Sequence, residues 1–225
     1  VSESLKNDTI STFGIKNDIR VIPNFVNTHR FNRKEERCDM KNIVTDDEKI
    51  ILHVSNFRPV KRIADIIRMF VKVKPKIKSK LLLVGEGPER IPAQELAQDL
   101  GLRDNVVFLG QQEGVDNILS CADLYLLPSE QESFGLSALE AMSCEVPVIG
   151  TNVGGLPELI KHGETGYITE VGDVDKMALH AVDLLTDDTL RKTIGQQARQ
   201  RVLDNFAEES VVPQYESYYE EVLDQ

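Results

Sequence analysis

The stretch Glu132-Ser-Phe-Gly-Leu-Ser-Ala-Leu-Glu140 follows an apolar run, Asp123-Leu-Tyr-Leu-Leu-Pro128, that ends at a proline. The apolar run is typical of a buried strand, and the residues after Gly135 predict a helix that continues through Met142. Gly135 allows a backbone conformation that is closed to other residues, and Ser133 is the predicted N-cap. The sequence therefore predicts a strand–loop–helix junction, where the first helical amides lack internal partners and attract an anion such as phosphate.

Two carboxylates flank this predicted anion site. Glu132 lies in the loop, and Glu140 lies about 7–8 Å along the helix, with its side chain leaning back toward the helix N-terminus. Carboxylates around exposed amides suit a ligand whose phosphates are flanked by hydroxyl-rich groups, as in a nucleotide sugar. The alternative is a surface helix with two solvated glutamates, and the neighbouring loops help to decide between the two.

Apolar runs alternate with helical ones on both sides of the junction. Strands are predicted at residues 49–54, 80–84, 105–109, 123–127, 146–149 and 166–169. Helices are predicted at about 62–73, 88–100, 115–121, 135–144 and 154–158, and residues 173–223 are expected to be all helical. Because the strands have no internal polar positions, this alternation predicts an α/β fold with a Rossmann-like parallel sheet, helices on both faces and right-handed connections.

In an open parallel sheet, ligands bind beyond the carboxyl ends of the strands. The loop after the first long strand, Ser55-Asn-Phe-Arg-Pro-Val-Lys61, places Arg58, Lys61 and Arg62 where a diphosphate would arrive. Arginine offers bidentate contacts and lysine a mobile point charge. A solvated basic helix start is the alternative, but cations at a helix N-terminus oppose the helix dipole, which favours a binding role.

Three other motifs have structural interpretations. Gly85-Glu86-Gly87-Pro88 forms a tight turn that either approaches a ligand or serves the fold alone. Gly154-Gly-Leu-Pro-Glu158 predicts a loop with its proline in the first turn of a short helix. Asp173-Val-Asp175 is similar to a metal-binding pair, but it precedes a helix, where aspartate is a good cap. We therefore predict no metal site. His53, in a buried strand, is expected to be a satisfied core residue.

The chain ends carry local signals of their own. A helix is predicted to start at Ser2 and stop at Gly14, and a short strand is predicted at 19–22. Residues 27–47 are polar and are interpreted as a mobile connection. The last helix is expected to bend or restart at Pro213 without being abolished. Its apolar-aromatic stripe is formed by residues 211, 215, 218, 219 and 222.

Composition excludes some classes of partner. The chain has 225 residues and a net charge of −11, which argues against nucleic acid or an anionic membrane as the main partner. Three cysteines are too few for a disulfide framework. No signal peptide or membrane-spanning run is visible, so a reducing cytoplasm is the expected location.

At this point the residues resemble a known family. Two glutamates with seven residues between them, after a strand ending in Pro128-Ser129, are similar to the donor-site signature of retaining GT-B glycosyltransferases of family four. The basic loop of that family runs Gly-Arg-x-x-x-x-Lys. Lys61 matches the lysine, but Asn56 stands where the family has arginine, and Arg58 is expected to take over. The run from 53 to 62 resembles members that transfer N-acetylglucosamine from UDP to L-malate in bacillithiol synthesis.

The resemblance implies a larger enzyme with two Rossmann-like halves and the active site between them. It implies donor UDP-N-acetylglucosamine, a hydroxy-acid acceptor, retention of the anomeric configuration and no metal ion. It also implies a partner in the N-terminal half of the same enzyme, and it leaves a homodimer open. On this basis the chain is expected to be a fragment, inactive in isolation. Its parts would be the end of the N-terminal domain (1–24), a connecting segment (25–48), the nucleotide-sugar-binding domain (49–204) and a C-terminal crossover helix (205–225).

The resemblance also assigns roles. Lys61 and Arg58 would stabilise the leaving diphosphate, and Glu140 would hold the ribose hydroxyls. Glu132 and the amides of 134–136 would hold sugar hydroxyls and phosphate. The catalytic candidates are Lys61, Arg58 and Glu132, and the donor-binding candidates are Ser55, Asn56, Gly85, Glu86, Ser133, Phe134, Gly135, Leu136 and Glu140. Three alternatives stay open: another family-four transferase of polysaccharide or glycolipid synthesis, a UDP-sugar epimerase of the same architecture, and a nucleotide-sugar-binding module without turnover.

Overall fold

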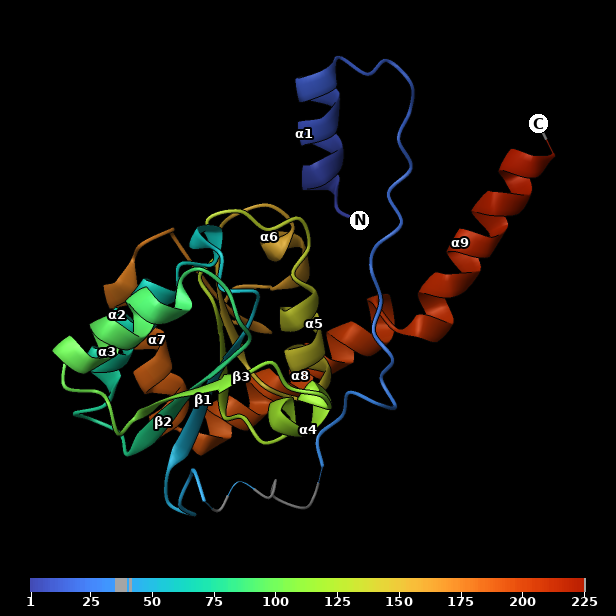
Figure 1. Cartoon of the computed structure of the whole chain (residues 1–225). Coiled ribbons are helices and arrows are strands. Elements are labelled where there is room, and N and C mark those ends of the chain that lie inside the picture. The colour runs from blue at the N-terminus through green and yellow to red at the C-terminus, as the bar shows by residue number, and fades with distance from the viewer. Residues whose placement is uncertain (35–39, 41, 225) are drawn as a thin grey trace.

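The computed structural model describes residues 1–34, 40 and 42–224, and its centre is a six-stranded parallel sheet (Figure 1). The strand order is β3-β2-β1-β4-β5-β6, so the chain reverses its direction of winding between β1 and β4. The strands are β1 (Lys49–Val54), β2 (Ser79–Val84), β3 (Val106–Gly110), β4 (Leu124–Leu127), β5 (Val148–Thr151) and β6 (Gly166–Thr169).

Helices cover both faces of the sheet. One core cluster joins alternate strand residues such as Ile51, Leu83 and Leu126 to α2 (Ile63–Val73), α3 (Arg90–Asp99) and α7 (Val174–Thr186). The other cluster joins the intervening residues, such as Leu52 and Leu127, to α4 (Val115–Leu119), α5 (Leu136–Ser143) and α8 (Asp188–Asn205). Since side chains alternate across a strand, strands that are apolar at every position need both layers. The predicted Rossmann-like α/β fold is confirmed.

Two predictions about the first 50 residues need revision. The strand expected at 19–22 is wrong: these residues adopt no strand, and nearby only Val26 forms a bridge, to Ala207. A short apolar run becomes a strand only when a neighbouring strand pairs with it. The predicted connection at 27–47 includes residues 35–39 and 41, which lie outside the described residues. In its described part Phe31 and Val44 are buried in the core.

The terminal helices match their local signals. The first helix, α1 (Glu3–Phe13), has Ser2 as its N-cap and Gly14 in the left-handed conformation as its C-cap, as predicted. The last helix, α9 (Glu208–Leu223), continues through Pro213 as one element. Figure 1 shows α1 and α9 projecting from the sheet domain, with the segment that follows α1 running back past α9.

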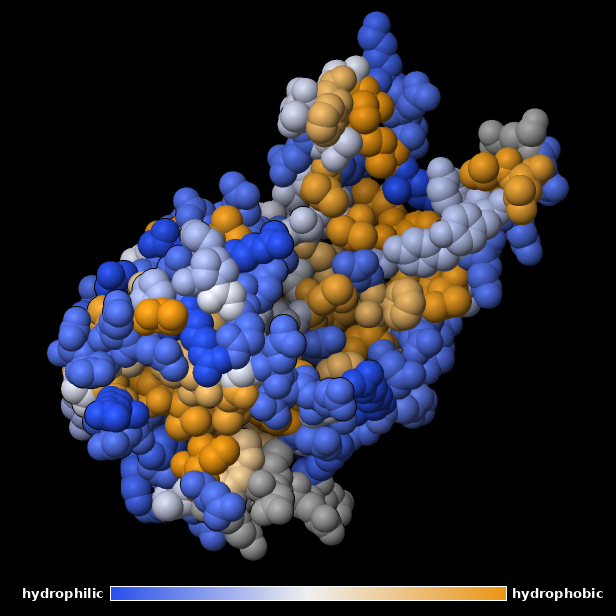
Figure 2. All heavy atoms as spheres, in the orientation of Figure 1, coloured by the Kyte–Doolittle hydropathy of each residue, from blue (hydrophilic) through white to orange (hydrophobic). Residues whose placement is uncertain are grey.

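Contacts tie that segment to α9. The Tyr215 hydroxyl donates to the carbonyl of Ile22 at 3.3 Å, and Arg20 pairs with Glu221 at 2.8 Å while its guanidinium lies over the ring of Tyr218. Figure 2 shows apolar side chains gathered between α1, this segment and α9. Tyr219 and Val222 remain more than half exposed.

Among the described residues, no helix is both long and apolar enough to cross a bilayer. Cys144 is a buried free thiol, and burial raises its pKa to about 12.

Candidate functional site

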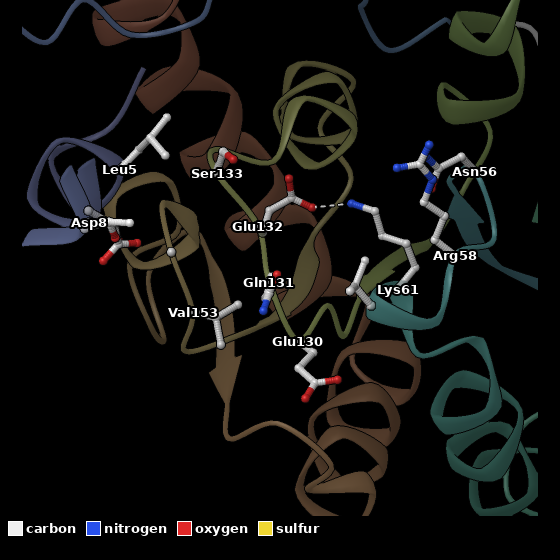
Figure 3. A pocket seen from close by; sticks show the side chains of 14 residues that line it. Leu5, Asp8, Asn56, Arg58, Lys61, Glu130, Gln131, Glu132, Ser133 and Val153 are labelled. Carbon is white, nitrogen blue, oxygen red and sulfur yellow. Dashed lines mark hydrogen bonds and ion pairs between the residues drawn. The ribbon is translucent and has the colours of Figure 1, made fainter.

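An open pocket of about 750 Å³ lies beyond the carboxyl ends of β1 and β4 (Figure 3). These are the strands between which the winding reverses, and such a switch point is where open α/β sheets bind ligands. The pocket is lined mainly by polar residues from α1, the loop after β1, the loop after β4 and the loop after β5. They are Ser4, Leu5, Asp8, Thr12, Asn56, Arg58, Val60, Lys61, Glu130, Gln131, Glu132, Ser133, Val153 and Gly154.

An ion pair crosses the pocket between the two predicted catalytic loops. The Lys61 ammonium lies 2.6 Å from a carboxylate oxygen of Glu132, and both side chains are mostly buried. The hydroxyl of Ser129 donates to the same carboxylate at 3.4 Å. Lys61 ends the short 3-10 helix η1 (Pro59–Lys61), so a rigid turn carries the ammonium. The structure thus brings together two residues that lie 71 positions apart.

The predicted cluster of three cations is split. Arg58 and Asn56 are exposed and line the pocket on the same side as Lys61 (Figure 3). Arg62 does not line it: its guanidinium pairs with Asp65 at 2.6 Å and with Glu130 at 3.7 Å. Two cations therefore face the pocket, and Asn56 presents a neutral amide between the strand end and Arg58.

Ser55 lies beneath the side of the pocket that Asn56, Arg58 and Lys61 line. The Nδ1 of His53 contacts the carbonyl of Leu126 at 2.8 Å, and its Nε2 contacts the Ser55 hydroxyl at 2.7 Å. Because a carbonyl can only accept, Nδ1 carries the proton and Nε2 accepts from Ser55. Burial lowers the pKa of His53 to about 4, so the ring stays neutral. His53 is the satisfied core residue that was predicted, and it joins β1 to β4 under the site.

Tyr125 is a residue near the site that the sequence argument does not single out. It is fully buried, its hydroxyl donates to the carbonyl of Val54 at 3.1 Å, and burial raises its pKa. It joins the end of β1 to β4 at the floor of the switch point. The sequence feature that could have pointed to Tyr125 is its place as the single polar aromatic residue inside the aliphatic run from 124 to 127.

Gly85 and Glu86 do not line the pocket. A Cβ at Gly85 would lie 1.8 Å from the carbonyl oxygen of Ser55, so this glycine lets the loop after β2 pack against the loop after β1. Glu86 forms an ion pair with Arg90 on α3. In this structure the turn supports the neighbouring loop.

The loop before α5 departs from one local prediction. Ser133 is not the N-cap, because α5 starts one residue after Gly135, which has φ of 100° and offers no capping side chain. Ser133 lines the pocket, Phe134 is buried edge-on against Phe206, and Leu136 is half exposed. Without a capping side chain, the start of α5 keeps the uncapped geometry that can bind an anion.

Glu140 is separated from this pocket. It is half buried on α5 and does not line the pocket described above. Burial raises its pKa to about 7, partly offset by Arg30 and reinforced by Asp116. Glu140 therefore titrates near neutral pH on a helix that begins at the switch point.

The candidate metal pair is a helix cap. The Asp173 side chain accepts from the backbone amide of Lys176 at 3.0 Å at the start of α7, and Asp175 pairs with Lys72 at 2.7 Å. Within the described ranges, no group of three or more histidine, cysteine or acidic side chains is placed to hold a metal ion.

The strand order, with a polar pocket at the switch point, defines a Rossmann-like α/β domain. Residues 35–201 match the family described as Glycosyl transferases group 1, and the chain belongs to this family. N-acetyl-alpha-D-glucosaminyl L-malate synthase of Bacillus anthracis is 45% identical over 99% of this chain and 59% of its own length. An uncharacterized glycosyltransferase of Methanocaldococcus jannaschii is 35% identical over 94% of this chain and 57% of its own.

Solved structures show the same architecture. Sucrose-phosphate synthase of Thermosynechococcus elongatus superposes with a TM-score of 0.90 at 28% identity, covering 100% of this chain and 58% of that one. TarM of S. aureus, crystallised in complex with UDP and other ligands, has a TM-score of 0.84 at 27% identity, covering 96% and 42%. The chain spans about three-fifths of the length of these two curated relatives.

Proposed function

We propose that this chain is the donor-binding half of a retaining glycosyltransferase that moves N-acetylglucosamine from UDP to the hydroxyl of L-malate. The observation that carries the donor site is the Lys61–Glu132 ion pair across the pocket at the switch point. The 45% identity to N-acetyl-alpha-D-glucosaminyl L-malate synthase over 99% of the chain supports the choice of sugar and acceptor.

In the proposed reaction, the bond between the sugar C1 and the diphosphate oxygen breaks, and the acceptor oxygen bonds to C1 from the same face. Negative charge then grows on the diphosphate, where Lys61 and Arg58 stabilise it. The departing phosphate oxygen takes the proton of the acceptor hydroxyl. The proposal assigns Glu132, released from Lys61 by the incoming diphosphate, to the sugar hydroxyls. It assigns Glu140, which lies outside the lining of the pocket, to a ribose that extends past that lining toward α5. No metal ion takes part.

Product analysis tests this function. A longer protein that carries this chain is incubated with UDP-N-acetylglucosamine, with and without L-malate, and the products are identified by mass spectrometry and NMR. We expect UDP and an α-linked N-acetylglucosaminyl malate only when malate is present. Formation of an epimerised UDP sugar without malate would replace the proposal with the epimerase alternative. Transfer to a sugar or lipid acceptor, but not to malate, would replace it with a polysaccharide or glycolipid transferase.

A further inference from the structure

The first turn of α1 is held by a side chain that is distant from it in sequence. The Glu158 carboxylate accepts from the backbone amide of Glu3 at 2.9 Å through Oε2, and from that of Ser4 at 2.8 Å through Oε1. These amides have no acceptor within the helix, and a carboxylate at a helix N-terminus also gains from the helix dipole. Glu158 lies in α6 (Leu156–Leu159), some 155 residues away along the chain.

Ser2 makes a second contact between α1 and the site. Its hydroxyl accepts from the amide of Leu5 at 3.1 Å and donates to the carbonyl of Ser133 at 2.7 Å. The Ser2 side chain is almost fully buried, so it is a cap and a bridge at once. The residue it touches follows Glu132 directly, which links the start of α1 to the backbone of the predicted catalytic loop.

The element that carries Glu158 is itself fixed to the domain. Arg201 on α8 donates to the carbonyls of Glu158 and Leu159 at 2.6 and 2.8 Å. At the other end of α6, the amide of Gly155 donates to the carbonyl of Glu132 at 3.1 Å. The short helix α6 therefore contacts α8, the Glu132 loop and α1.

Through these contacts α1 forms one wall of the pocket. Ser4, Leu5, Asp8 and Thr12 line it from α1. Figure 3 shows Leu5 and Asp8 on the side opposite Arg58, with Glu132 between them. The cations that suit a diphosphate lie on the far wall, so α1 faces the part of a ligand that extends beyond the diphosphate.

We propose that Glu158 is a positioning residue of the pocket. It holds the first turn of α1 against α6, which keeps the α1 wall in place and steadies the backbone of Glu132 and Ser133. The identity of the ligand rests on the function proposed above. The hydrogen-bonded contact between α6 and α1 is independent of that proposed function.

The test uses the 225-residue chain with Glu158→Ala, Glu158→Gln and the control Glu164→Ala, which changes an exposed carboxylate nearby. Hydrogen exchange reports on α1 and on residues 131–134, and calorimetry measures UDP and UDP-N-acetylglucosamine. In Glu158→Ala we expect α1 amides to exchange about tenfold faster or more. We expect UDP-N-acetylglucosamine to bind about fivefold more weakly or worse, and UDP to change by less than about twofold. Glu158→Gln, which keeps one accepting oxygen, should fall between the wild type and Glu158→Ala.

Unchanged exchange of α1 in Glu158→Ala would overturn the proposal. An equal loss of affinity for UDP and UDP-N-acetylglucosamine would also overturn it, since a general loss of structure weakens both. If the wild-type chain binds neither nucleotide, the function proposed above is wrong. Hydrogen exchange then still tests the positioning role of Glu158. Faster exchange in both α1 and 131–134 then supports it, and unchanged exchange in either overturns it.

Discussion

At the scale of single residues, the Lys61–Glu132 pair determines the charge that a ligand meets. The chain carries a net charge of −11, so an anionic ligand needs local cations at its site. Lys61 and Arg58 provide them, and Glu132 holds the Lys61 ammonium in place before a ligand arrives.

Replacing Lys61 with alanine is expected to weaken UDP binding. A charge-assisted contact contributes about 1.5–3 kcal/mol, which corresponds to a loss of affinity of about 10- to 150-fold. Lys72→Ala is the matched control, because Lys72 pairs with Asp175 on the surface and does not line the pocket. Calorimetry on the three proteins decides, and equal affinity in Lys61→Ala and Lys72→Ala would remove Lys61 from the donor site.

Glu140 predicts a pH-dependent stability. Its folded-state pKa of about 7 lies above the ordinary value of 4.5, so the folded state binds the proton more tightly than the unfolded state. The stability that this group contributes is fully present below about pH 4.5 and is lost as pH rises through 7. Glu140→Gln avoids this loss.

Urea unfolding between pH 4.5 and 8 measures the effect. The free energy of unfolding of Glu140→Gln, relative to wild type, is expected to increase by about 1–3 kcal/mol over this range, after allowance for partial exposure. Glu95→Gln, which removes an exposed carboxylate on α3, is the control. A difference for Glu140→Gln that does not change between pH 4.5 and 8 would show that the Glu140 carboxyl is ionised at neutral pH.

At the scale of elements, the loops after β4 and β5 support one another. Gly154 has φ of 52°, and a Cβ there would lie 1.7 Å from the carbonyl oxygen of Glu132. Gly101 has φ of 68° but open space around the same position. The two glycines thus separate backbone strain from a steric clash.

Gly154→Ala is therefore expected to be much more harmful than Gly101→Ala. Backbone strain alone costs about 1–2 kcal/mol, whereas displacing the Glu132 loop adds about 1–3 kcal/mol and also weakens binding of UDP-N-acetylglucosamine. Urea midpoints and calorimetry give both quantities. Equal destabilisation of the two variants, with UDP-N-acetylglucosamine affinity unchanged, would show that the loop moves without cost to the site.

The exposed end of α9 leads to a prediction about its partner. Tyr219, Val222 and Leu223 are 62%, 51% and 84% exposed, an unusual arrangement for large apolar side chains at the end of a helix. We expect the backbone amides of residues 214–223 to exchange faster in this chain than in a longer protein that contains it, where this end of the helix gains a partner. Equal exchange in both would mean that Tyr215 and the contacts of Arg20 already give the helix its full protection.

The sequence predicts the elements better than it predicts the contacts between them. Strands 49–54 and 166–169 appear with the predicted bounds because an uninterrupted apolar run has few other ways to be buried. Ser133 fails as a cap because Gly135 sets the local backbone. The bonds of Glu158 to α1 join residues about 155 positions apart, and no local pattern encodes them.

At the scale of the whole molecule, the site is built at one edge of the sheet from loops that the strand order brings together. The Rossmann-like arrangement could be predicted because periodicity and loop positions determine it. The part played by α1 could not, because its position depends on bonds from its backbone amides to the Glu158 carboxylate of α6, and on a bond from Ser2 to the Ser133 carbonyl.

Metal independence is a prediction for the entire enzyme. Asp173 caps a helix and Asp175 forms an ion pair. The two cations proposed to stabilise the diphosphate are the side chains of Lys61 and Arg58. EDTA is expected to leave UDP binding by this chain, and turnover by a longer protein that contains it, within about twofold of the untreated value. A strict requirement for added divalent metal would contradict the proposed mechanism.

The contact of Arg20 with Glu221 and Tyr218 also has a consequence for the order in which parts of the chain fold. Arg20 and Glu221 are 201 positions apart, so this contact forms only after residue 221 has been synthesised. Contacts between distant residues require closure of long loops, whereas each strand of the sheet meets a neighbour much sooner. Since domains begin to fold while synthesis proceeds, we expect residues 15–25 to lack their α9 partners while the sheet assembles. We expect them to pack along α9 after the sheet has formed.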